Sequence, residues 1–403
     1  MERIIRIITS ILGTNKLRRR AILTATAVGL SGCISSWRSS PDDLQKLAPT
    51  SWRMAGKNAQ NTSRLDAIRG SKIDDISWNK PIASQFVSPI VMTKNHALVS
   101  TQSKLIGFDK ADGTIAFSHS LPGGMAAAPA VTDTHILVPR DTYGEGFDSD
   151  IDLQAPTLYA LDRETKQRVW EHTLDGNYLA SVAVADDIYV QSDREAYRLT
   201  ADGTTTWRQT FDQAFDWRKT LSYLRPVIGP DGVYIGHRDT LVKLDRAAGD
   251  VRWTRSMEKT VFPPVIAGDT TVITSTNDAI VAVSPADGQI QWRVSKPPVW
   301  APAISETIAV ASTSKGLLGI DPASGEQQWH ADQSLSTCPP VIAGNTVFTA
   351  PGMTLTAVDA ETGERIDSRG TDWRVTWITP DSGGVLTRQP TTDGVLLERY
   401  PLR

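Results

Sequence analysis

Three alternating aspartates are the residues of this sequence that most resemble a metal-binding site. Asp148, Asp150 and Asp152 occupy every second position of one short stretch. Calcium ions favour several carboxylates on a single flexible loop, so this stretch is a candidate calcium site. Leu153, however, stands at the position where an EF-hand loop needs glycine. We therefore favour a solvated acidic loop over a metal site.

The other residue types that carry chemistry are scattered along the chain. No two of the six histidines have the spacing of metal ligands. These histidines are His96, His119, His135, His172, His237 and His330. The sequence also lacks a Gly-x-Ser-x-Gly nucleophile elbow and a phosphate-binding glycine loop. We therefore predict no catalytic residue, and the protein is not expected to be an enzyme.

The N-terminal residues follow the order of an export signal. Arg18-Arg19-Arg20 precedes a weakly apolar stretch, residues 21–32, which is too short to span a bilayer. The pair Arg19-Arg20, followed by Ile22 and Leu23, resembles a twin-arginine signal, with general export as the open alternative. Residues 1–32 are therefore predicted to be a signal peptide.

The end of this stretch predicts a lipid anchor. Leu30-Ser31-Gly32-Cys33 resembles a lipobox, so Cys33 is expected to become the lipid-carrying first residue of the mature chain. Residues 33–50 would then be a tether on the outer side of the cytoplasmic membrane, or on the outer membrane if the host is bacterial. The only other cysteine is Cys338, so no intramolecular disulfide is expected in the mature chain. Cys338 is either a buried small apolar residue or a reactive thiol, and burial is the commoner fate.

The charge balance argues against nucleic acid as a partner. Removing residues 1–32, with six basic residues and one acidic residue, changes the formal net charge from −3 to −8. An acidic surface repels a phosphate backbone. The 34 Asp against 11 Glu and the 28 Arg against 14 Lys resemble the composition of salt-adapted archaeal proteins. Asn61-Thr62-Ser63 is a glycosylation sequon, which makes Asn61 a candidate glycan site in an exported chain.

A unit that recurs along nearly the whole chain must position all of these residues. It consists of an aliphatic strand ending in Asp, a tight turn ending in Gly, and Trp four residues later, as in Leu244-Asp245, Gly249 and Trp253. From Phe117 to Asp367, the residues at the Trp position follow one another at intervals of 53, 37, 46, 39, 37 and 38. Pro-containing strand starts and one further strand complete each unit. Four short strands in about 40 residues predict a blade of a β-propeller.

The two ends of the chain decide the number of blades. Seven complete units end between residues 117 and 367, and an eighth stops one strand short. The missing strand is expected to be Asp75-Ile76-Ser77-Trp78, since pairing the first strand with the last blade closes the ring. The prediction is an all-β, eight-bladed propeller over residues 51–403, with seven blades as the alternative.

The Leu-x-Ala-Leu-Asp…Thr-Gly-x-x-x-Trp unit resembles the PQQ-like repeat over roughly residues 50–403. This repeat is shared by quinoprotein alcohol dehydrogenases and by the outer-membrane assembly lipoproteins of the BamB family. Residues 51–62 also resemble the N-terminal segment of BamB-like members. The repeat tryptophans are expected to hold neighbouring blades together; they are Trp78, Trp170, Trp207, Trp253, Trp292 and Trp329.

The resemblance also raises pyrroloquinoline quinone as a cofactor. Quinoprotein dehydrogenases resemble one another in a vicinal cysteine pair, in a calcium site of acidic and amide side chains, and in an Asp base. This chain has no Cys-Cys pair and no Cys-x-x-Cys-His haem attachment. No cofactor is therefore expected, and a quinone- or calcium-dependent oxidoreductase, or an accessory subunit of one, is the alternative function.

Two long insertions predict which face binds partners. The repeat is stretched at residues 139–156, between the second and third strands of a blade, and at residues 211–224, between two blades. Both connections emerge on the same face of a propeller, and long loops on one face commonly form the binding face. The residues directly before each blade are expected to ring the channel mouth on that face, or to plug it; they are Val87, Ala127, Leu179, Leu224, Phe262, Trp300, Cys338 and Arg374.

These features together predict a lipid-anchored, non-catalytic scaffold that binds protein partners in the cell envelope. The resemblance to BamB implies a role in the assembly or organisation of envelope or secreted proteins. The predicted partner-binding residues are Phe215, Trp217, Arg218, Tyr223, Phe262, Trp300, Arg374, Tyr143 and Phe147.

Overall fold

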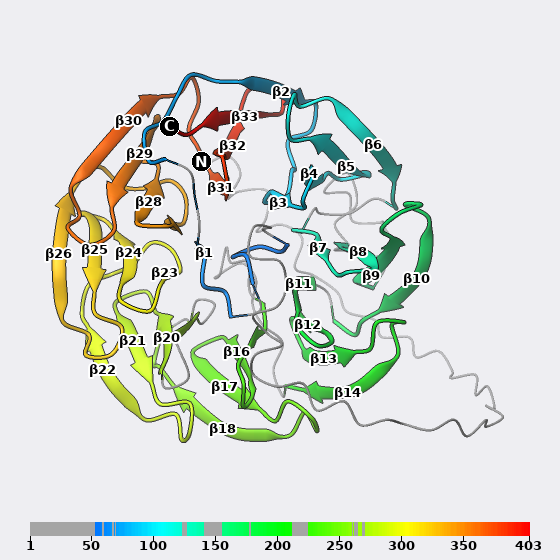
Figure 1. The fold of residues 1–403 in the computed structure, drawn as a ribbon. Coiled ribbons are helices and arrows are strands. Elements are labelled where there is room, and N and C mark those ends of the chain that lie inside the picture. The colour runs from blue at the N-terminus through cyan, green and yellow to red at the C-terminus, as the bar shows by residue number, and fades with distance from the viewer. Residues whose placement is uncertain are drawn as a thin grey trace, which may run out of the picture.

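The chain forms a ring of eight antiparallel blades around a central axis, which confirms the predicted eight-bladed propeller (Figure 1). The computed structural model describes residues 53–58, 60–66, 68, 70–122, 127–140, 155–176, 179–211, 225–259, 261, 265–267 and 271–403. In this part of the chain, no helix has the length and apolar character needed to span a membrane.

The strands of each blade run outward from the axis in sequence order. Blade 1 contains β3 (Val91–Met92), β4 (His96–Ser100), β5 (Lys104–Asp109) and β6 (Ile115–Ser120). Blade 2 contains β7 (Ala130–Val131), β8 (His135–Arg140), β9 (Thr157–Asp162) and β10 (Arg168–Thr173). Blade 3 contains β11 (Leu179–Val184), β12 (Ile188–Ser192), β13 (Glu195–Leu199) and β14 (Thr205–Thr210). Blade 4 contains β15 (Val227–Ile228), β16 (Val233–His237), β17 (Thr240–Leu244) and β18 (Val251–Ser256).

The second half of the ring repeats this order. Blade 5 contains β19 (Val265–Ala267), β20 (Thr271–Ser275), β21 (Ile280–Val283) and β22 (Ile290–Val294). Blade 6 contains β23 (Ala303–Ile304), β24 (Ala309–Thr313), β25 (Gly316–Ile320) and β26 (Gln327–Asp332). Blade 7 contains β27 (Val341–Ala343), β28 (Thr346–Thr349), β29 (Thr354–Asp359) and β30 (Arg365–Gly370), with β1 (Arg64–Leu65) added at its inner edge. Blade 8 contains β31 (Trp377–Asp381), β32 (Gly384–Pro390), β33 (Val395–Pro401) and β2 (Trp78–Ile82).

The N-terminal strand closes the ring, as predicted. β2 pairs antiparallel with β33, from Trp78↔Arg399 to Ile82↔Val395. The strand begins at Trp78 and not at Asp75, so the predicted bounds were three residues too early. The preceding residues continue the joint, since Ile73 bridges Leu402 and its amide donates to Asp367 Oδ2 at 2.8 Å. Asp367, the residue at the repeat's Trp position in blade 7, thus lies at the closure.

The repeat tryptophans connect each blade to the next. Each tryptophan donates from Nε1 to a backbone carbonyl in the following blade, at 3.0 or 3.1 Å. The carbonyl belongs to the second residue of the turn between the third and fourth strands of that blade. The six pairs are Trp78–Lys110, Trp170–Ala201, Trp207–Arg246, Trp253–Pro285, Trp292–Pro322 and Trp329–Ala360. Between blades 1 and 2 the contact differs, because Phe117 stands at the Trp position. Lys166 Nζ of blade 2 lies 4.9 Å from the centroid of its ring.

The turn that receives each tryptophan explains the Asp and Gly of the repeat. Asp245 Oδ1 accepts from the amides of Ala247 and Ala248, and the amide of Gly249 donates to the Asp245 carbonyl at 2.9 Å. Gly249 has φ +80°, and a Cβ there would lie 2.6 Å from Cδ2 of Trp207. The turn therefore needs glycine both for its backbone conformation and for the approach of the neighbouring ring.

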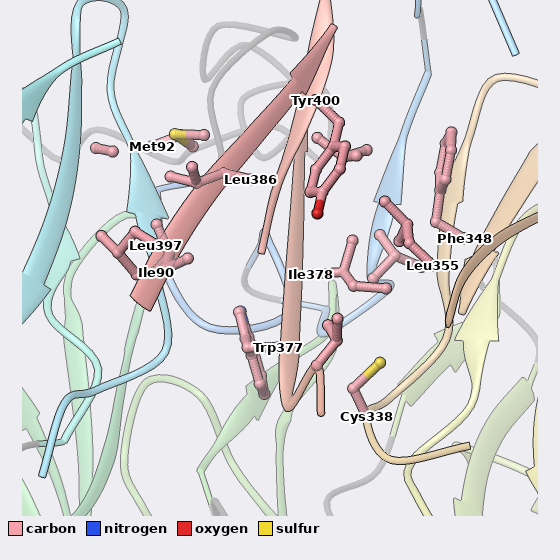
Figure 2. Packing of buried hydrophobic residues seen from close by; sticks show 14 of the residues in the cluster. Ile90, Met92, Cys338, Phe348, Leu355, Trp377, Ile378, Leu386, Leu397 and Tyr400 are labelled. Atoms are coloured by element: carbon pink, nitrogen blue, oxygen red, sulfur yellow. The ribbon is translucent and has the colours of Figure 1, made fainter. Parts of the chain in front are cut away.

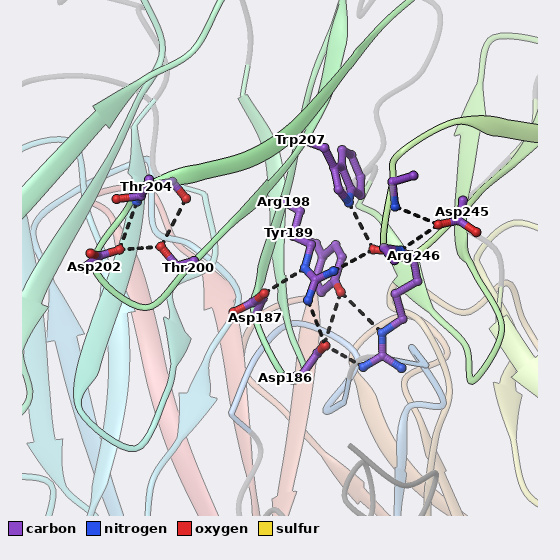
Figure 3. Close-up of polar contacts among 12 residues, drawn as sticks. Asp186, Asp187, Tyr189, Arg198, Thr200, Asp202, Thr204, Trp207, Asp245 and Arg246 are labelled. Atoms are coloured by element: carbon purple, nitrogen blue, oxygen red, sulfur yellow. Dashed lines mark hydrogen bonds and ion pairs between the residues drawn. The ribbon is translucent and has the colours of Figure 1, made fainter. Parts of the chain in front are cut away.

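Ion pairs on the same side strengthen the contact between blades 3 and 4 (Figure 3). Asp186 accepts from Arg246 Nη2 at 2.6 Å, and Arg198 Nη1 donates to the Arg246 carbonyl at 2.9 Å. Partial burial opposes ionisation of Asp186, yet Arg246 and Arg198 hold its pKa below the usual value. The hydroxyl of Tyr189 also donates to Asp186, at 3.1 Å. This polar network thus joins blade 3 to the same turn of blade 4 that Trp207 contacts.

The largest apolar cluster spans the closure of the ring. It joins blades 7, 8 and 1, and it includes Ala55 and Leu65 from the N-terminal segment. Figure 2 labels ten of its side chains, which are Ile90, Met92, Cys338, Phe348, Leu355, Trp377, Ile378, Leu386, Leu397 and Tyr400. The closure is therefore held by apolar packing as well as by the pairing of β2 with β33.

The connections between strands define two faces. In a blade whose strands follow one another in sequence, the turn between the first and second strands lies beside the turn between the third and fourth strands, and we call this side the turn face. In blade 1, for example, Lys110 N donates to the Asn95 carbonyl. The segment that leads into a blade pairs, through an isolated β-bridge, with the connection between the second and third strands of that blade. We call the side on which these segments and connections lie the loop face. The four bridges are Val87↔Thr101, Val261↔Thr276, Pro298↔Thr313 and Ser336↔Pro351.

Candidate functional site

The centre of the ring is filled by part of the chain itself. Residues 53–58 and 60–66, the axial segment, cross the central channel (Figure 1). The Arg53 carbonyl accepts from Val131 N in blade 2, and the Thr62 carbonyl accepts from Ile304 N in blade 6. In blade 7, β1 pairs parallel with β27. The axial segment thus bonds to the innermost strands of three blades.

Apolar side chains anchor the axial segment. Met54 packs in the cluster of blades 2, 3 and 4, and Leu65 packs in the cluster at the ring closure. Both side chains are buried. The resemblance of residues 51–62 to the N-terminal segment of BamB-like members gave no indication that these residues occupy the axis. Three non-glycine residues of the axial segment, Lys57, Asn61 and Ser63, have positive φ, which residue types in a sequence do not reveal.

The position of Asn61 argues against the predicted glycan. Its side chain is 3% exposed at the centre of the ring, and its φ is 60°. A glycan is bulky and needs a surface position. The folded chain leaves no room for one at Asn61, so the sequon does not mark a glycosylation site in this structure.

The two insertions start from the loop face, but most of their predicted residues lie outside the described part of the chain. The first insertion connects β8 to β9, and the second connects β14 to β15. The structure does not describe Tyr143, Phe147, Asp148, Asp150, Asp152, Phe215, Trp217, Arg218, Tyr223, Leu224 or Phe262. Cys33 and the predicted tether lie outside the described residues as well. These residues remain predictions.

The residues expected to ring the channel mouth turn out to differ in exposure. Val87 and Cys338 are buried, which agrees with the alternative that these residues pack inside the ring and not with an open mouth lined by them. Trp300 is half-buried, and its Nε1 donates to the Ser336 carbonyl at 3.2 Å. Arg374 is exposed. The described members therefore range from buried to exposed and do not form one uniform ring.

The loop face nevertheless exposes an apolar sector, which consists of Phe86, Leu335, Met353 and Trp373. These side chains are 46%, 48%, 52% and 38% exposed. Phe86 directly precedes Val87, and Trp373 directly precedes Arg374. Because successive side chains of an extended segment point in opposite directions, burial of Val87 turns its neighbour outward. Phe86 and Trp373 each stand one residue before a position that was predicted to ring the channel mouth, whereas no pattern in the sequence singled out Leu335 or Met353.

Backbone contacts tie the apolar sector together across blades 7, 8 and 1. Leu335 adjoins the bridge Ser336↔Pro351, and the Met353 carbonyl accepts from Thr371 N at 2.9 Å. The Thr371 hydroxyl donates to the Trp373 carbonyl at 2.8 Å. Beside Phe86, the Val87 carbonyl accepts from Arg388 Nη1 of blade 8. The four side chains thus lie on connections of three neighbouring blades whose backbone is hydrogen-bonded.

Cys338 is a packing residue and not an exposed thiol. It is fully buried in the cluster at the ring closure, and this burial raises the pKa of its thiol to about 12. Since the thiolate is the reactive form, we expect a maleimide to leave Cys338 unlabelled between pH 6 and 9 in the folded protein. Adding guanidinium chloride should then give full labelling, as measured by mass spectrometry. Rapid labelling without denaturant would contradict this placement.

The described residues offer no assembled catalytic or metal centre. Among them, no group of three or more His, Cys, Asp and Glu side chains could hold a metal ion. Four histidines contact aromatic rings instead, in the pairs His96–Phe117, His135–Trp170, His172–Tyr197 and His237–Phe211. With the axial segment in the channel, the described residues do not fit a quinone held beside calcium. We derive no reaction step through such a group.

Comparison with protein families gives one match. A family model described as outer membrane protein assembly factor BamB matches residues 151–259 and 192–397, which together exceed half of the chain. No curated protein matches the chain in sequence.

Several solved structures share the fold. BamB from Moraxella catarrhalis is 15% identical, with a TM-score of 0.63 over 82% of this chain and 98% of that chain. Quinohemoprotein alcohol dehydrogenase from Comamonas testosteroni is 12% identical, with a TM-score of 0.69 over 90% of this chain and 82% of that chain. Quinohemoprotein alcohol dehydrogenase ADHIIG from Pseudomonas putida HK5 is 10% identical, with a TM-score of 0.64 over 88% and 80%. At such low identity these likenesses establish the fold alone.

Proposed function

Since the chain belongs to the family described as outer membrane protein assembly factor BamB, we propose that it is a non-catalytic scaffold that binds protein partners in the cell envelope. The observation that carries this proposal is the apolar sector on the loop face. A cluster of exposed large apolar side chains on a rigid face is typical of a protein-recognition surface. Phe86, Leu335, Met353 and Trp373 supply such a cluster next to the exposed charge of Arg374.

The role we propose is help in the assembly or organisation of envelope or secreted proteins. A propeller is a scaffold whose function lies in the surfaces grafted onto it. The two long insertions also begin on the loop face, and we propose that their aromatic residues, including Trp217 and Phe147, take part in partner binding. The partner would insert apolar side chains into the sector and leave its polar rim hydrated.

The proposed location is the outer side of the cytoplasmic membrane, or the outer membrane in a bacterial host, with lipid on Cys33. The order of arginines, apolar stretch and Leu30-Ser31-Gly32-Cys33 supports this proposal. Arg53, the first described residue, pairs with Asp133 on the turn face at 2.8 Å. This ion pair ties the start of the described chain to blade 2.

The proposal is tested by capture of partners from the host's own membranes. The triple variant Leu335→Ser, Met353→Ser, Trp373→Ser should reduce the amount of crosslinked partner at least roughly tenfold, because hot-spot residues carry most of the binding energy. Quantitative mass spectrometry of the crosslinked material measures this. The three side chains are exposed, so the Tm should stay within a few degrees of the wild-type value.

A matched control tests whether partners bind the loop face in particular and not exposed apolar side chains in general. Ile115 and Ile290 are 62% and 46% exposed at the start of outermost strands, away from the loop face. The variant Ile115→Ser, Ile290→Ser should capture partners as the wild type does. If the triple variant captures as much as this control, the apolar sector is not the binding surface.

The fold shared with quinohemoprotein alcohol dehydrogenases gives the alternative, an oxidoreductase or an accessory subunit of one. Its test is direct. Protein purified from its host would carry a quinone absorption band together with one calcium ion per chain, and this result would overturn the scaffold proposal.

A further inference from the structure

One methionine lies in the apolar sector, while the other methionines in the described part of the chain are buried. Met353 is 52% exposed. The others, Met54, Met92 and Met257, are 2%, 1% and 4% exposed. Met92 belongs to the core cluster of blades 7, 8 and 1, the same blades that carry the apolar sector. Among the described methionines, a reagent in the solvent therefore reaches Met353 first.

The fold of the blade does not require methionine at position 353. The Met353 carbonyl accepts from Thr371 N, the amide that directly follows the outermost strand of blade 7. The same backbone hydrogen bond occurs in blades 1, 3 and 4, where the accepting residues are Ser103, Arg194 and Asp239. These three equivalent residues are polar and exposed. Because a polar residue suits the fold at this position, the thioether of Met353 belongs to the surface and not to the architecture.

An exposed thioether can be oxidised by a peroxide. The sulfur attacks one oxygen of hydrogen peroxide, an S–O bond forms, and the O–O bond breaks. The proton of the transferred hydroxyl passes to the departing oxygen, so the products are methionine sulfoxide and water. The sulfur loses two electrons and the peroxide gains them. The reaction replaces an apolar side chain by a polar, chiral one, and methionine sulfoxide reductases reverse it.

We propose that Met353 is a reversible oxidation site, at which a peroxide switches off partner binding by the apolar sector. This inference rests on the proposed function, since it concerns the same surface. A partner that covers Met353 has to desolvate the sulfoxide oxygen, and an apolar partner side chain offers that oxygen no hydrogen bond. In the location that we propose, outside the cytoplasmic membrane, the protein is separated from the thiol reductants of the cytosol.

Peptide mass spectrometry of the whole mature chain, treated with hydrogen peroxide, tests the oxidation site. One oxygen atom, about 16 Da, should appear on Met353 while the buried Met54, Met92 and Met257 stay unmodified. Guanidinium chloride should make all four react alike, because unfolding exposes the buried three. If Met353 is oxidised no faster than these three in the folded protein, the proposal is overturned.

Capture of partners from host membranes, measured by crosslinking and quantitative mass spectrometry, tests the switch. Protein that has been treated with peroxide, and then with catalase, should capture at least roughly fivefold less partner than untreated protein. Methionine sulfoxide reductase with dithiothreitol should restore capture. Met353→Leu keeps an apolar side chain of similar volume, so its capture should equal that of the wild type both before and after peroxide. Met353→Gln should reduce capture without any peroxide.

The variants distinguish failure of this inference from failure of the proposed function. If peroxide lowers capture by Met353→Leu as much as by the wild type, another residue is responsible, such as Met125, which lies outside the described residues, and the proposal is overturned. If peroxide leaves capture unchanged while the triple variant Leu335→Ser, Met353→Ser, Trp373→Ser reduces it, the apolar sector binds partners but Met353 is not its switch. If neither peroxide nor the triple variant changes capture, the proposed binding surface and its switch are both wrong.

Discussion

Replacing Trp207 by alanine is expected to lower the free energy of unfolding by about 4 kcal/mol. The ring of Trp207 is 7% exposed and packs on Gly249 of the next blade, and its Nε1 donates to the Arg246 carbonyl at 3.0 Å. Alanine would leave a cavity between two blades, and the Arg246 carbonyl would keep only the hydrogen bond from Arg198 Nη1. Both effects add to the lost apolar contact. Denaturant titration followed by far-UV circular dichroism measures the loss.

Two further variants make the test specific to the contact between blades. Gly249→Ala should also destabilise, because its Cβ would lie 2.6 Å from Cδ2 of Trp207 and its φ is +80°. Trp373→Ala should change the free energy of unfolding by no more than about 0.5 kcal/mol, since that ring is exposed on the loop face. A loss for Trp207→Ala as small as that for Trp373→Ala would show that this ring does not hold the blades together.

Replacing Leu65 by aspartate is expected to cost about 4 kcal/mol of stability, or to prevent folding of the ring. Leu65 lies on β1, which pairs with β27, and its fully buried side chain packs in the cluster that joins blades 7, 8 and 1. An aspartate there would place an unpaired carboxylate in this apolar cluster. The axial segment would leave the channel, and the largest core cluster would lose contacts at the ring closure.

The measurement combines stability with local accessibility. Hydrogen exchange should become faster in β27 as well as in residues 60–66, because the two segments share backbone hydrogen bonds such as Ile342 N to the Ser63 carbonyl. Ile115→Asp, at a position that is 62% exposed, is the matched control and should leave both segments protected. If Leu65→Asp unfolds at the same denaturant concentration as this control, the axial segment is not part of the stable core.

The axial segment also bears on the choice between scaffold and enzyme. The fold shared with quinohemoprotein alcohol dehydrogenases does not by itself imply their chemistry, because function depends on particular sites. In this chain, Met54 and Leu65 anchor peptide in the channel, and the described residues around it assemble no metal-binding group. The apolar sector lies instead on the loop face, where the exposed side chains of Trp373 and Phe86 are available to a partner.

The sequence by itself determined the propeller, the number of blades and the closure by the first strand. Each of these depends on short-range chemistry that repeats, namely an Asp that accepts turn amides, a Gly with positive φ and a Trp four residues later. Because seven units are complete and the eighth lacks one strand, the strand at Trp78 was predicted to complete the eighth blade, and it pairs there with β33. Even there, the predicted strand began three residues too early, because the residues before Trp78 form the isolated bridge Ile73↔Leu402 and not part of the ladder.

Only the tertiary structure decided which residues face the partner side and what fills the channel. Phe86 and Val87 are neighbours of similar character, and the bridge Val87↔Thr101 determines which of them is buried. The path of the axial segment depends on contacts with blades 2, 6 and 7, which are far away in the sequence.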